Sequence, residues 1–98
     1  MYLGIAWYKR DEWSRLKNEF ADSTRMHNTW NEWRQATEAG MESMLRINKI
    51  MYPIVLEADQ IKEYCLKNNK PNTSSTRVRM VNEVLHILIS ETEIKRTT

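Results

Sequence analysis

A chain of 98 residues and 11.8 kDa has room for one domain with one hydrophobic core. Hydrophobic residues make up 41% of the chain and charged residues 29%, which excludes an intrinsically disordered composition. The net charge of +2 is too near neutral to indicate nucleic-acid binding by charge alone. The single cysteine, Cys65, excludes an internal disulfide and suits a reducing compartment.

The apolar stretches are too short to form a signal peptide or to cross a membrane. Residues 3–8 form the longest apolar run near the start, and no basic stretch precedes it. The most apolar stretch, 84–89, is interrupted by His86, and no window approaches the ~20 apolar residues of a spanning helix. We therefore expect one compact cytoplasmic domain over residues 1–98 that has no membrane partner.

The hydrophobic pattern predicts two strands, four helices and a polar tail. Alternating apolar residues indicate the strands, and apolar residues at three- and four-residue spacing indicate the helices. Capping residues, asparagines and a proline mark where the helices begin and end. In chain order the predicted elements are a strand over 2–8, helices over 10–21 and 25–46, a strand over 49–56, helices over 60–68 and 75–89, and a tail over 90–98 that we expect to fray.

Small residues and a proline in the predicted strands indicate where neighbours can approach. Gly4 and Ala6 share one face of the first strand, and their small size leaves room for another element to pack closely. Pro53 removes one backbone hydrogen-bond donor from the second strand. This strand is therefore predicted to lie at a sheet edge or to contain a bulge.

The order strand, short helix, long helix occurs twice. An offset of 48 residues places Asp11 on Asp59 and Trp30 on Val78, which suggests a tandem βαα-βαα pseudo-repeat, although two unrelated amphipathic halves would match as well. If each helix reverses the chain direction, the two strands become antiparallel neighbours. We therefore predict an α+β fold with a two-stranded antiparallel sheet covered by four helices on one face. The residues predicted to be most buried are Ile5, Trp7, Leu16, Trp30, Ile54, Ile61, Val81, Leu85 and Leu88.

The chain carries no recognisable catalytic, metal or phosphate-loop motif. His27 and His86 lack Cys, Asp or Glu partners at metal-ligand spacing, and Cys65 has no second cysteine for a CxxC pair. With only two glycines, the chain has no glycine-rich phosphate loop. We interpret His86 as a helix-face residue and Cys65 as a small core residue. The sequence therefore predicts no cofactor and no metal, and it favours a protein that is not an enzyme.

Tryptophan density is the strongest local feature of the sequence. All four tryptophans lie within the first 33 residues, and Trp30 and Trp33 share one helical face. The rings form either the core beneath the first strand or a binding patch, because tryptophan is enriched at interface hot spots. Both interpretations hold if Trp13 and Trp33 are only half covered. The candidate partner surface consists of Trp13, Trp33 and Gly40, the last because small residues in the middle of the long helix let a partner backbone come close.

A basic segment, 67–79, contains no acidic residue. It spans the turn between the last two predicted helices and resembles a helix-turn-helix in outline, although its loop is longer than usual. A solvated positive face and an anion site at a helix N-terminus are the other interpretations. The candidate anion or nucleic-acid contacts are Lys67, Lys70, Arg77 and Arg79.

These features favour a small interaction or assembly module. We expect its partner to be a second copy or another protein, bound through the aromatic helix surface or an exposed strand edge. The alternative is a nucleic-acid-binding regulator that uses the basic segment 67–79, whose affinity would fall steeply with salt. An enzyme with an unrecognised site is the least favoured interpretation.

Overall fold

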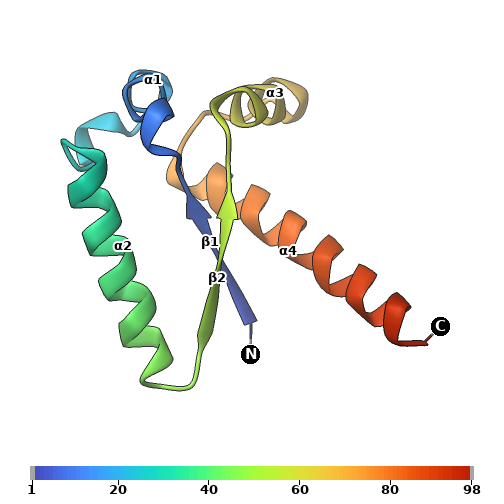
Figure 1. Ribbon diagram of the computed structural model, residues 1–98. Coiled ribbons are helices and arrows are strands. Elements are labelled where there is room, and N and C mark those ends of the chain that lie inside the picture. The colour runs from blue at the N-terminus through green and yellow to red at the C-terminus, as the bar shows by residue number, and fades with distance from the viewer. Residues whose placement is uncertain (1, 98) are drawn as a thin grey trace.

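Two strands and four helices follow one another through residues 2–97 of the computed structural model, which describes side chains for residues 3–24 and 26–90 (Figure 1). The fold is α+β, as predicted. Short 3₁₀ turns at Arg10–Glu12 and Ser23–Arg25 precede the first two helices. The main elements are β1 (Tyr2–Trp7), α1 (Trp13–Glu19), α2 (Trp30–Leu45), β2 (Ile50–Val55), α3 (Ala58–Asn68) and α4 (Ser74–Thr97).

The two strands are parallel, so the prediction of an antiparallel sheet is wrong. Tyr2 lies opposite Ile50 and Trp7 lies opposite Val55 in a two-stranded sheet. The prediction treated α1 as a full passage back along the sheet. Helix α1 has only 7 residues, about 10 Å at 1.5 Å per residue, and it lies beyond the carboxyl end of β1 (Figure 1). Only α2 returns the chain to the start of the sheet, and a single crossover produces parallel strands.

The register of the sheet follows the same offset as the two halves of the sequence. Each residue of β1 lies opposite the residue 48 positions later in β2. Both short helices, α1 and α3, lie beyond the carboxyl ends of the strands, and both are followed by a long helix (Figure 1). The order of elements therefore repeats, while a true duplication stays a prediction.

Helices α2 and α4 cover opposite faces of the sheet, whereas one covered face was predicted. Trp7 of β1 packs against Trp33 of α2, with ring centroids 5.0 Å apart. On the other face, a Cβ built on Gly4 would approach Cγ1 of Val81 in α4 to 2.5 Å. Side chains three positions apart in a strand point to opposite faces, so β1 lies between the two helices. The close approach predicted at Gly4 is confirmed.

Replacing Gly4 with alanine should lower the free energy of unfolding by about 1–3 kcal/mol, because the added methyl group pushes α4 away from the sheet. Urea denaturation measures this change. The matched control is Gly40→Ala in α2, where a Cβ would meet nothing within 4 Å. That control should be neutral or stabilise the fold by up to about 1 kcal/mol. An equal loss at both glycines would contradict the packing explanation.

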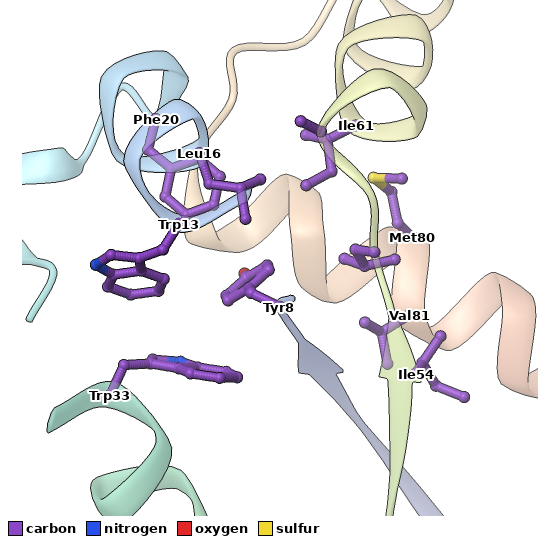
Figure 2. Close-up of a cluster of buried hydrophobic side chains, with 11 residues drawn as sticks. Tyr8, Trp13, Leu16, Phe20, Trp33, Ile54, Ile61, Met80 and Val81 are labelled. Carbon is purple, nitrogen blue, oxygen red and sulfur yellow. The ribbon is translucent and has the colours of Figure 1, made fainter. Parts of the chain in front are cut away.

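The core lies where α1, α3 and the first turns of α4 meet the carboxyl ends of the strands (Figure 2). Burial is confirmed for four of the predicted core residues, Leu16, Ile54, Ile61 and Val81. Leu88 is instead 47% exposed, because α4 continues past the sheet. The buried core also contains residues that were not predicted, among them Tyr8, Phe20, Leu56, Ala58 and Met80.

Two helix boundaries differ from those predicted by five residues or more. Helix α2 begins at Trp30, five residues later than expected at residue 25, because Thr29 caps it. The Thr29 Oγ1 accepts a hydrogen bond from the backbone N–H of Glu32 at 3.1 Å. Helix α4 continues to Thr97 and does not stop at residue 89. The side chains from residue 91 onward lie outside the described residues, so fraying of the tail stays a prediction.

Candidate functional site

Trp13 and Trp33 lie in the hydrophobic core. Their exposed fractions are 6% and 7%. The Trp33 ring lies 5.1 Å from the Tyr8 ring and 5.6 Å from the Trp13 ring, so the three form one aromatic cluster (Figure 2). The core interpretation is therefore confirmed for these two tryptophans. The third member of the candidate surface, Gly40, is exposed, and no neighbouring element in the described part of the chain uses its small size.

Arg77 lies in the interior, not on a basic surface, and is only 3% exposed. Its Nε donates a hydrogen bond to the Tyr8 hydroxyl at 2.9 Å, and its Nη2 donates to both carboxylate oxygens of Asp22 at 3.1 and 3.0 Å. Its Nη1 donates to two oxygens of Asn72, and the guanidinium lies 3.7 Å from the Phe20 ring centroid. These bonds use the five donors of the guanidinium. Arg77 therefore has no donor left for a phosphate.

The other three basic candidates remain on the surface. Lys67 is in the last turn of α3, Lys70 is in the loop that follows, and Arg79 is on the exposed side of α4. Without Arg77, the basic segment 67–79 offers three exposed charges to an anion. This smaller set weakens the argument for a nucleic-acid interface.

Asp22 and Tyr8, the partners that hold Arg77, do not stand out in the sequence as functional residues. Asp22 lies between the first two predicted helices, and its carboxylate also accepts a hydrogen bond from the backbone N–H of Ser74 at 3.1 Å, at the start of α4. Burial raises the pKa of the Tyr8 phenol, and the nearby Arg77 guanidinium opposes this rise. The phenol therefore stays neutral and accepts the Arg77 hydrogen bond. This cluster joins β1, the Ser23–Arg25 turn region and α4, and its role is to hold the fold together.

One edge of β1 has no strand partner in the described part of the chain. The backbone carbonyl of Trp7 accepts a hydrogen bond from Leu56 at 3.0 Å, so Trp7 faces β2. Backbone groups alternate in direction along a strand, and those of Gly4 and Ala6 therefore face away from β2. The carbonyl of Tyr8, which faces the same side, accepts a hydrogen bond from the Trp30 indole at 2.8 Å. The outer edge of β1, defined here by Gly4 and Ala6, is therefore open up to Tyr8.

A cleft of about 290 Å³ runs along the outer edge of β1. Both long helices contribute to its walls, because α2 and α4 lie on opposite faces of the strand. The charged residue in its wall is Arg77, which is already paired with Asp22. The wall of the cleft therefore presents no unpaired charge to a ligand. Its walls include Gly4 and Ala6 from β1, Trp33 and Thr37 from α2, and Ser74 and Val78 from α4.

The outer edge of β2, unlike that of β1, cannot pair continuously with another strand. Leu56 donates its N–H toward β1, so the backbone groups of Pro53, three residues earlier, face outward. Proline has no N–H, and a proline on an edge strand prevents continuous pairing with another strand. The prediction that Pro53 marks a sheet edge is confirmed.

The apolar stripe of α4 begins in the core and continues into solvent. Val81, where α4 crosses β1, is 2% exposed. Val84 and Leu88 continue the same stripe at spacings of three and four residues, and both are exposed. Ile87 lies beside them and is 56% exposed. Val84, Ile87 and Leu88 together form what we call the α4 overhang.

The remaining candidates are a reactive cysteine, a metal site and a membrane-spanning helix. Cys65 is half-buried, and burial raises the pKa of its thiol, which disfavours the nucleophilic thiolate. Within the described residues, no three His, Cys, Asp or Glu side chains are grouped to hold a metal ion. None of the helices in that part of the chain is both long enough and apolar enough to cross a bilayer.

In the described part of the chain, the outer edge of β1 and the α4 overhang are both left uncovered. Comparisons of the chain with protein-family models, with curated proteins and with solved structures found no match.

Proposed function

We propose that this chain is a self-associating assembly module that forms a twofold dimer through the α4 overhang. The observation that carries the proposal is the change from a buried stripe at Val81 to an exposed one at Val84 and Ile87. Soluble monomers rarely expose large contiguous apolar patches, and such patches commonly mark interfaces. Complete burial of an aliphatic side chain of this size contributes roughly 1.5–3 kcal/mol.

The sheet supplies a surface that suits the overhang. Helix α4 packs mainly over β1 and leaves Ile50 and Tyr52 of β2 exposed. Tyr52 lies opposite Gly4 in the register, so both β2 side chains point to the face that α4 covers. The overhang of a second copy, laid beside α4, would cover them. A twofold axis makes this contact reciprocal, as isologous dimers require.

The test is the molar mass in solution, measured by light scattering over a range of concentrations. The unmodified protein should be dimeric at about 100 μM. Ile87→Glu should raise the dissociation constant about 100-fold, or by roughly 2.8 kcal/mol, because it places a carboxylate in an apolar contact. The matched control is His86→Glu, one residue away on the exposed polar face of α4, which should leave the dimer intact. A monomeric unmodified protein, or equal effects of the two variants, would overturn the proposal.

A further inference from the structure

We infer that the outer edge of β1 accepts an extended, uncharged peptide segment, which becomes a third strand of the sheet between α2 and α4. This inference does not rest on self-association through the α4 overhang, because the two surfaces belong to different elements.

The backbone of β1 specifies the chemistry of the ligand. Gly4 and Ala6 direct two N–H and two C=O groups away from β2, and no hydrogen bond from the described residues, 3–24 and 26–90, takes them up. A row of unpaired donors and acceptors on a strand edge is a template for another strand. An extended polypeptide presents matching groups at the same spacing, which gives affinity with little dependence on its sequence.

The residues that line the cleft determine which side chains of the peptide fit. A strand added to β1 would direct alternate side chains toward α2, where Trp33 and Thr37 line the cleft, and toward α4, where Val78 does. The side chain of Thr37, in the middle of α2, is small, so the backbone of the added peptide can approach this helix closely. Arg77 is neutralised by Asp22, so the wall offers no free charge to a charged ligand. Small or β-branched uncharged residues therefore fit this site.

A peptide fits this edge better than a second copy of the protein. Both α2 and α4 line the cleft from opposite faces of β1. Pairing the β1 edges of two copies would bring these helices against the same helices of the other copy. A single extended chain has no such helices and can lie between them. The edge of β2 is not an alternative site, because Pro53 interrupts its row of donors.

The first experiment adds a defined peptide to the full chain and follows the backbone amides by NMR. The probe is an alternating threonine–valine hexapeptide with a lysine at each end for solubility. In the free protein the amides of Gly4 and Ala6 should exchange with solvent rapidly, and saturating peptide should slow them at least tenfold. The control peptide has the same sequence with every backbone nitrogen methylated and should have no effect. Equal effects of the two peptides, or no protection at Gly4 and Ala6, would overturn the inference.

The second experiment changes the protein. Ala6→Pro removes an outward N–H without removing a hydrogen bond to β2, and Pro53 shows that an outward-facing position of this sheet accepts a proline. Peptide affinity should fall at least tenfold, whereas Ala6→Ser, which keeps the N–H, should bind normally. If Ala6→Pro fails to fold, the methylated peptide still decides the question. If Ala6→Pro folds and converts a dimer to a monomer, the edge belongs to a second copy and the peptide assignment is wrong.

Discussion

Arg77→Leu is expected to lower the free energy of unfolding by about 3–5 kcal/mol, because it leaves a buried ion pair without its cation. The side chain of Arg77 is 4% exposed and that of Asp22 is 21% exposed, so water cannot fully replace the lost partner. The Tyr8 hydroxyl loses its donor, and Phe20 loses the guanidinium that lies over its ring. Urea denaturation followed by tryptophan fluorescence would measure the loss.

The matched control for this prediction is Arg79→Leu. Arg79 lies two residues later on α4, has the same charge and is exposed. Its replacement should change the free energy of unfolding by no more than about 0.5 kcal/mol. Similar small effects of the two substitutions would show that Arg77 does not hold the fold together.

Trp33→Ala should lower the free energy of unfolding by about 3–5 kcal/mol, the range for removing a large aromatic side chain from a core. The Trp33 ring contacts those of Trp7, Tyr8 and Trp13, so its removal leaves a cavity bounded by three elements that cannot easily collapse. Thermal or urea unfolding would measure the change.

Trp30→Ala provides the comparison within the same helix. Trp30 is half-buried and donates one hydrogen bond to the Tyr8 carbonyl. We expect its replacement to cost about 1–2 kcal/mol, from a lost hydrogen bond and part of a ring's burial. A larger loss at Trp30 than at Trp33 would contradict the assignment of Trp33 to the centre of the aromatic cluster.

The sequence pattern was sufficient to predict the strands and helices, but it was not sufficient to predict the direction of the second strand. The periodicity that predicts a strand or a helix is local, and both strands lie where it indicates. Strand direction depends on how many helices pass back along the sheet, which is a property of helix length. The prediction extended the first helix over residues 10–21, whereas α1 covers Trp13–Glu19 and is too short for such a passage.

The candidate site was predicted in part. Pro53 correctly indicated an edge strand, and Gly4 correctly indicated close packing. The open edge of β1 could not be identified, because it depends on a register set by residues 48 positions apart. The sequence does carry a signal for the burial of Arg77. It precedes Val81 by four residues on the inward stripe of α4, a position at which a charged residue needs a buried partner.

The register of the sheet has a consequence for folding during synthesis. Since β1 pairs only with β2 in the described chain, the strand has no partner until the ribosome has added 48 further residues. At roughly 5–20 residues per second, this takes on the order of 2–10 s. The segment of α4 that covers Gly4, around Val81, is made later still. An apolar segment made early is therefore among the last to be covered, and we expect a nascent chain that ends before Ile50 to need a chaperone to stay soluble.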